Sequence, residues 1–152
     1  MSAIYYGHGI ATDEIENTDI DRVKKLLAMA PGIYEELSPI FDEIEEDCDG
    51  DANEFASQLA DEWCSKEFGD MGSAGYASLL AGVINECEGI RMVSMTDNTA
   101  YAYLIMPERA PWQFNHKEKS LTEEGLFTII RKYVNVLTDD VLTIEYRSIE
   151  LD

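Results

Sequence analysis

The chain has 152 residues, of which 45% are hydrophobic, and its 31 acidic and 11 basic residues give a formal net charge of −20. This length and hydrophobic content predict one folded domain and argue against a disordered chain. The charge argues against direct nucleic-acid binding, because phosphates would be repelled, and no apolar run is long enough to predict a membrane span.

Cysteine usage and the start of the chain bear on the cellular compartment. Cys48, Cys64 and Cys87 are odd in number and contain no C-x-x-C pair, so we expect reduced thiols. No basic segment followed by an apolar run opens the chain, so no signal peptide is expected. Together these features predict a cytoplasmic protein.

The first predicted elements are a strand and a helix. Residues 3–6 favour a strand that ends in a turn at residues 7–9. Thr18 has the side chain of a helix N-cap, and acidic residues follow it in the first turn, where the helix dipole favours them. The expected buried stripe of this helix is Ile20, Val23, Leu26, Leu27 and Ala30. Residues 31–32, a Pro-Gly pair, are expected to end it.

The next predicted helix, residues 33–47, has apolar and acidic residues on different sides. The apolar positions are Ile33, Leu37, Ile40, Phe41 and Ile44. Pro39 removes a backbone donor and disfavours a helical Ser38. Either the helix kinks at Pro39, or a new helix begins there with Ser38 as its cap. Asp51 then opens a capping box for a third helix that runs to Trp63.

After a glycine-rich connection at residues 69–75, residues 76–87 form a largely apolar helix. Residues 90–96 and 99–106 then have the composition of strands, separated by Asp97 and Asn98 as a two-residue hairpin turn. This register pairs Met92 with Tyr103 and Ser94 with Tyr101. We expect residues 107–121 to form a loop and Thr122 to cap the last helix. In a final strand, residues 141–151, alternation places Leu142, Ile144 and Tyr146 on the buried face.

This order of elements predicts an α+β fold in one domain, residues 1–152. Residues 18–88 form an acidic helical part. Residues 89–152 form a hairpin, a helix and a strand, so that a small antiparallel sheet carries one packed helix.

The stretch between Lys25 and Lys66 contains many carboxylates and neither Lys nor Arg. The carboxylates expected to bind a partner are Glu35, Glu36, Asp42, Glu43, Glu46, Asp47 and Asp49. Carboxylates three or four positions apart on a helix are about 5–6 Å apart, which is similar to the spacing of nucleic-acid phosphates. Most charge runs are simply solvated faces, but such faces normally mix both signs. A basic partner is therefore predicted.

Two loops partly match the patterns of known ligand sites. With Gly50 at the sixth position of a calcium-binding loop, Glu45, Asp47 and Asp49 take the first, third and fifth positions, but Ala56 stands where a bidentate Glu is required. Residues 69–75 space their glycines like a dinucleotide-binding loop, yet they follow a helix and have no lysine for a phosphate. No metal or cofactor is predicted.

Histidines and aromatic residues supply the remaining candidates. His8 lies between two glycines and could serve a small enzyme or a metal-dependent binding protein together with cysteine and acidic residues. No spacing pre-positions such ligands, so no catalytic residue is assigned. Trp112 and Phe114, with Lys117 and Lys119 nearby, could form a second contact with a partner or cover an edge of the sheet.

In its size, its pI near 4.2 and its clustered carboxylates at residues 33–62, the chain resembles small phage-encoded anti-defence proteins, namely anti-restriction and anti-CRISPR nucleic-acid mimics. The resemblance implies a non-enzymatic inhibitor that occupies the basic nucleic-acid-binding cleft of a nuclease, an effector complex or a DNA-binding protein in the host cytoplasm. A third possibility is an acidic soluble scaffold without a specific basic partner.

Overall fold

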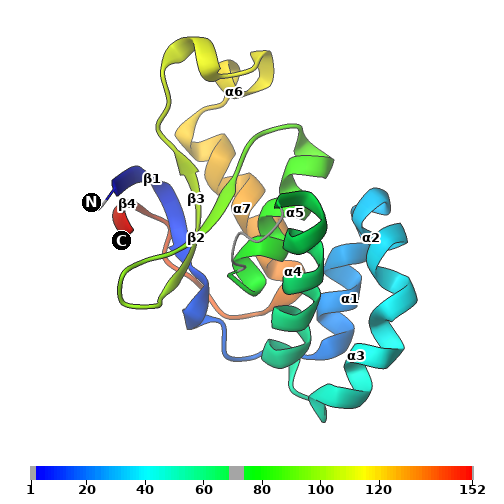
Figure 1. Ribbon diagram of the computed structural model, residues 1–152. Coiled ribbons are helices and arrows are strands. Elements are labelled where there is room, and N and C mark those ends of the chain that lie inside the picture. The colour runs from blue at the N-terminus through cyan, green and yellow to red at the C-terminus, as the bar shows by residue number, and fades with distance from the viewer. Residues whose placement is uncertain (1–2, 69–73, 152) are drawn as a thin grey trace.

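A curved antiparallel sheet stands beside a group of helices in the computed structural model, which describes residues 3–68 and 74–151 (Figure 1). The helices and strands are β1 (Ala3–Ala11), α1 (Ile20–Ala28), α2 (Pro31–Leu37), α3 (Phe41–Cys48), α4 (Ala52–Phe68), α5 (Tyr76–Glu88), β2 (Val93–Thr96), β3 (Ala102–Pro107), α6 (His116–Ser120), α7 (Glu123–Leu137) and β4 (Glu145–Leu151). Single turns of 3₁₀ helix are η1 (Thr12–Glu14), η2 (Ser38–Ile40) and η3 (Pro111–Gln113). The predicted α+β class is confirmed. Most of the predicted connection at residues 69–75 lies outside the described residues.

One hydrophobic core joins the helices to the sheet. It includes Val23 of α1, Phe55 of α4 and Leu104 of β3, all fully buried. Helix α5 packs on β2 and β3, and α7 reaches β1 where Phe127 packs against His8. Within the described ranges, no helix is long and apolar enough to cross a membrane.

The helix boundaries differ slightly from prediction. The N-cap of α1 is Asp19 and not Thr18, because the Asp19 carboxylate accepts a hydrogen bond from the Arg22 amide at 2.9 Å. Pro31 does not follow the first helix as a stop but begins α2, where its missing N–H has no intrahelical partner to lose. Asp51 caps α4 as predicted, with hydrogen bonds from the amides of Asn53 and Glu54.

The chain between α2 and α3 settles how Pro39 is accommodated. Residues Ser38–Ile40 form the 3₁₀ turn η2, and the Ser38 side chain makes no capping hydrogen bond. The helical path is thus interrupted rather than restarted by a capped helix. On the inner side of both helices, Ile33, Leu37 and Phe41 are buried as predicted.

The sheet has the strand order β2-β3-β1-β4, with all neighbours antiparallel. The predicted turn at residues 7–9 is wrong, because β1 continues through it to Ala11 and lies in the middle of the sheet. The glycines permit an unusually close approach of β3. A Cβ atom on Gly9 would lie 2.1 Å from the Leu104 carbonyl oxygen, and one on Gly7 would lie 2.1 Å from that of Met106.

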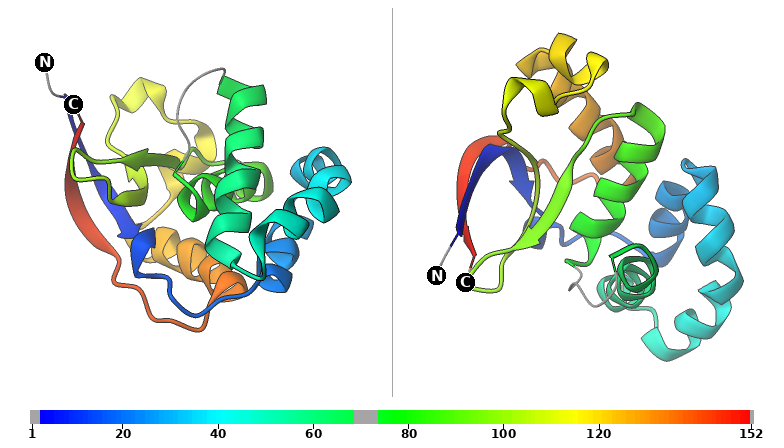
Figure 2. Two further views of the ribbon diagram at one scale, coloured as in Figure 1. Left: turned by 60° about the horizontal axis from the view of Figure 1, so that its bottom comes forward. Right: turned by 45° about the horizontal axis from the view of Figure 1, so that its top comes forward.

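The sheet curls until its two outer strands come near each other at one end (Figure 2). The Asn98 amide, in the β2–β3 loop, donates a hydrogen bond to the Glu150 carbonyl of β4 at 3.0 Å. Ile105 and Ile149 are buried on the sheet face opposite Ile10, outside the main core. The loop contact covers part of the β4 edge, where free backbone groups could otherwise pair with another chain.

The hairpin register was predicted incorrectly. Met95, and not Met92, lies opposite Tyr103, and the loop takes up residues 97–101 in place of a two-residue turn. The cause is Asp97, whose Oδ1 accepts hydrogen bonds from the amides of Thr99 and Tyr101 and from the Thr99 hydroxyl. An Asp side chain that closes its own turn in this way competes with the tighter hairpin.

Two further predictions in the C-terminal part need correction. The predicted loop at residues 107–121 contains η3 and α6, and α6 is capped by reciprocal hydrogen bonds between Asn115 and Glu118. Tyr146 is 52% exposed, because the inward alternation shifts by one residue after Ile144 and continues at Arg147. Thr122 caps α7 as predicted.

Replacing Gly9 with alanine should destabilise the fold by about 1–3 kcal/mol, because the added Cβ would force β1 and β3 apart. Urea unfolding followed by circular dichroism measures the loss. Gly50→Ala is a useful comparison, since nothing lies within 4 Å of a Cβ at Gly50 and the strain there would be only that of its positive φ. Equal losses in the two variants would contradict the close-approach explanation.

Candidate partner-binding surface

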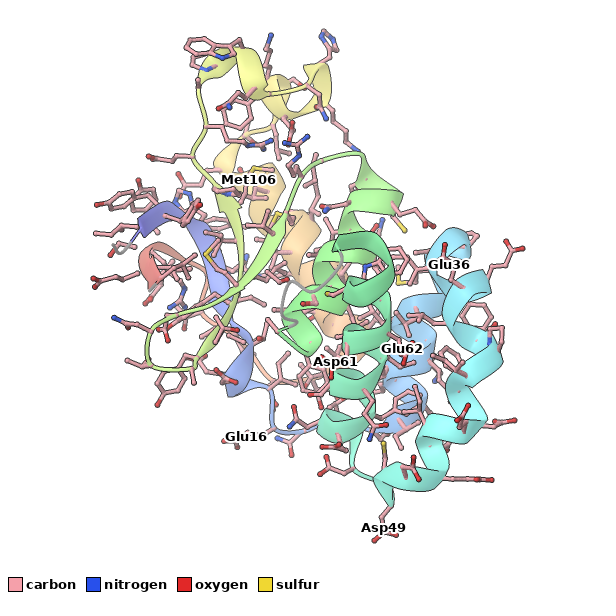
Figure 3. All side chains as sticks on the ribbon, in the orientation of Figure 1. Glu16, Glu36, Asp49, Asp61, Glu62 and Met106 are labelled. Atoms are coloured by element: carbon pink, nitrogen blue, oxygen red, sulfur yellow. The ribbon has the colours of Figure 1, made fainter. Side chains whose placement is uncertain are left out.

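The seven carboxylates predicted to bind a partner are all exposed and lie along α2, α3 and the residue that follows α3. Glu35 and Glu36 belong to α2; Asp42, Glu43, Glu46 and Asp47 belong to α3; Asp49 follows as the left-handed C-cap of α3. We call these seven residues the acidic surface. Figure 3 shows Glu36 and Asp49 toward opposite ends of this stretch, both directed away from the sheet.

Helical periodicity fixes this exposure. The apolar side chains of α2 and α3 pack inward against α1 and α4, so the intervening carboxylates must face outward. α2 and α3 lie on the side of the molecule farthest from β1 and β4 (Figure 1). The acidic surface is therefore accessible to a large partner.

The acidic surface has no internal counterions. Among the described residues, none of its seven side chains forms an ion pair with a basic residue. Lys24 lies nearby, but its Nζ bonds Glu45 at 2.7 Å and sits near the rings of Phe41 and Phe55. The hydrogen bond to Glu45 raises the pKa of Lys24, so this cation is committed to a carboxylate outside the surface.

Helix geometry makes four of these carboxylates unfavourable for stability. Glu35 and Glu36 lie near the C-terminal end of α2, and Glu46 and Asp47 near that of α3; neither helix has a basic residue in its last turn. A helix C-terminus carries partial negative charge, so each such carboxylate opposes folding by roughly 0.3–1 kcal/mol before solvent screening. Asp42 and Glu43, by contrast, lie in the first turn of α3, where the helix dipole favours negative charge.

The negative surface extends beyond the predicted residues onto α4, which packs against α3. Glu54, Asp61 and Glu62 are exposed there. Figure 3 shows Glu62 on the side of α4 toward α2, whereas Asp61 faces the sheet side and lines a pocket with Asp13 and Ala100. All three lie between Lys25 and Lys66, in the stretch that contains no basic residue, so the sequence already marked them as candidates. Their proximity to α3 depends on the antiparallel packing of two helices, which spacing along the sequence does not show.

The aromatic candidates lie elsewhere. Trp112 is 83% exposed on η3, whereas Phe114 is partly buried with the Arg109 guanidinium 4.6 Å from its ring centre. Figure 1 places α6, which follows them in sequence, at the opposite end of the molecule from α3. Trp112 and the acidic surface are thus separate surfaces, and Phe114 is a packing residue.

His8 contacts an acid and two aromatic rings. Its Nε2 is 3.6 Å from Glu123 Oε1, and its ring packs edge-on against Phe127 and Tyr146. Among the described residues, no hydrogen bond or ring contact joins His8 to a cysteine, and no three His, Cys, Asp or Glu residues gather in a way that could hold a metal ion.

Comparisons of the chain with protein-family models, with curated proteins and with solved structures gave no match.

Proposed function

We propose that this protein is a non-enzymatic inhibitor that binds the basic nucleic-acid-binding cleft of a nuclease or DNA-binding protein as a mimic of DNA or RNA. An anti-restriction or anti-CRISPR role in the host cytoplasm fits this activity. The observation that carries the proposal is the acidic surface: seven exposed carboxylates without a basic partner, four of them near helix ends that disfavour negative charge. A positively charged partner would turn this unfavourable arrangement into a favourable one.

The dimensions suit such a cleft. Helices α2 and α3, with the single turn η2 between them, run from Pro31 to Cys48, and at about 1.5 Å per residue their path is about 27 Å long. Fixed helices hold the charges in place, so little conformational entropy is lost on binding. The bound inhibitor would exclude the natural nucleic acid by occupying its site, and the negative field would speed the encounter.

Binding should weaken steeply as salt increases, because the attraction between an exposed acidic surface and a basic cleft is screened. Retention of proteins from a nuclease-rich bacterial lysate on the immobilised chain, followed by elution in a salt gradient, tests this. We expect one basic nucleic-acid-binding protein to be released sharply at moderate salt. Release of many basic proteins together at low salt would indicate an acidic scaffold without a specific partner.

A further inference from the structure

A cavity of about 490 Å³ lies away from the acidic surface, between α4, α5 and the edge strand β2. The space is partly open to solvent, and its volume lies within the range of about 300–1,000 Å³ that sites for small molecules span. The walls are mainly apolar and include Ile33, Trp63, Ala81 and Met92. A space of this size with such walls has the character of a ligand site.

The apolar walls are held in place by specific contacts. The Asn85 side chain accepts a hydrogen bond from the Met92 amide and donates one to the Met92 carbonyl, which fixes the start of β2 against α5. Gly82 keeps one wall open, since a Cβ there would lie 3.0 Å from the Ile33 Cδ1 and 3.2 Å from the Trp63 indole nitrogen. The cavity is therefore largely formed before any ligand enters.

Two hydroxyl groups in the cavity leave a donor unused. Ser78 and Ser94 place their Oγ atoms 2.9 Å apart, and Ser78 Oγ also accepts a hydrogen bond from the Ala74 amide. The Ser78 side chain also hydrogen-bonds the Cys64 thiol. When the thiol donates to Ser78 and Ser78 donates to Ser94, the Ser94 hydroxyl proton stays available for a further acceptor. Burial raises the pKa of the neighbouring Cys64 thiol, so this lining group is uncharged at neutral pH.

The indole N–H of Trp63 is a further donor. In the part of the chain that the structure describes, it has no hydrogen-bond partner. Among the described residues of the lining, Glu86 is the one carboxylate, and it already accepts hydrogen bonds from the amides of Gly32 and Ile33 at the start of α2. The cavity thus combines apolar walls with hydrogen-bond donors, and its described lining residues include no cation for an anionic ligand.

We propose that this cavity binds an uncharged, largely apolar small molecule that carries a hydrogen-bond acceptor such as a carbonyl group. This binding site is independent of the proposed inhibitor function, because no residue of the acidic surface lines the cavity. Trp63 lies against the ligand and Ser94 reaches its acceptor.

The environment-sensitive ketone Prodan is a suitable probe, because it is neutral, apolar and carries one carbonyl. In a Trp112→Phe variant, Trp63 is the remaining tryptophan of the two in the chain, so energy transfer from it reports occupancy. We expect one Prodan per chain, saturation below about 200 µM and a blue-shifted emission, as a ligand of this size allows.

Two variants test the placement of the probe. Ala81→Leu should fill the cavity from its α5 wall with a residue that favours helix, and should abolish saturable binding. Ser94→Ala should weaken binding about threefold to tenfold. The control variant Ser148→Ala, at an exposed position of β4, should have no effect. Circular dichroism checks folding of each variant. Absence of saturable binding, binding that survives Ala81→Leu, or equal affinity in Ser94→Ala would overturn the proposal.

Discussion

A variant in which Glu35, Glu36, Glu46 and Asp47 are replaced by lysine should lose affinity for its basic partner by about a hundredfold or more, while its thermal stability stays equal or rises. Juxtaposed like charges at an interface cost several kcal/mol, and each 1.4 kcal/mol is a factor of ten in affinity. Lysine near a helix C-terminus is favourable where a carboxylate is not. Calorimetric titration of the captured partner and thermal unfolding measure the two effects.

A matched control separates position from total charge. Replacing Glu14, Glu16, Glu124 and Glu150 by lysine also alters four exposed carboxylates, none in an ion pair within the described residues. Each reversal adds two charges, so both variants change from −20 to −12. Equal loss of affinity in the two would mean that overall charge, and not the acidic surface, governs binding.

Glu118→Ala should destabilise the fold by about 3–5 kcal/mol, because it leaves a buried cation without its carboxylate. The Glu118 side chain is 2% exposed; its oxygens accept hydrogen bonds from Arg109 Nη2 at 2.6 Å and from the amides of Arg91 and Asn115. Within the described residues, Arg109 Nε and Nη1 already lack hydrogen-bond partners. Urea unfolding measures the loss, and a double variant with Arg109→Met and Glu118→Leu should recover much of it.

The same carboxylate gives a pH dependence with a definite sign. Burial opposes the charge of Glu118, but hydrogen bonds from the Asn115 amide, Arg109 and the Arg91 amide outweigh it and lower its pKa. The resulting stability is present above the unfolded value, about 4.3, and is lost as the pH falls toward the lower folded pKa. Glu118→Gln should therefore lose less stability than the natural chain between pH 5 and pH 3. An unchanged pH profile would contradict this role.

Local periodicity made the helical part predictable. The spacing of Ile33, Leu37 and Phe41 determines which side of α2 and α3 is buried, and therefore that the acids between them are exposed. The unfavourable helix ends could not be predicted in the same way. They depend on where η2 divides the predicted helix, and Pro39 alone allowed two answers.

The sheet was harder to predict because its features depend on contacts distant in sequence. In the sequence alone, Gly7 and Gly9 indicate a turn. Their role in close packing depends on β3, which lies beside them only in the folded structure. The exposure of Tyr146 follows from a change of alternation within the chain leading into β4. The small-molecule cavity also depends on contacts distant in sequence, because residues of α2, α4, α5 and β2 all line it.

The proposed function requires that this protein and a nucleic acid compete for one site on the partner. The most direct measurement mixes the purified partner with a fluorescent oligonucleotide that it binds, and follows anisotropy as this protein is added. The account predicts complete displacement at about one inhibitor per binding site, with no displacement by the variant carrying lysine at positions 35, 36, 46 and 47. An oligonucleotide that stays bound at saturating inhibitor, or equal displacement by that variant, would contradict it.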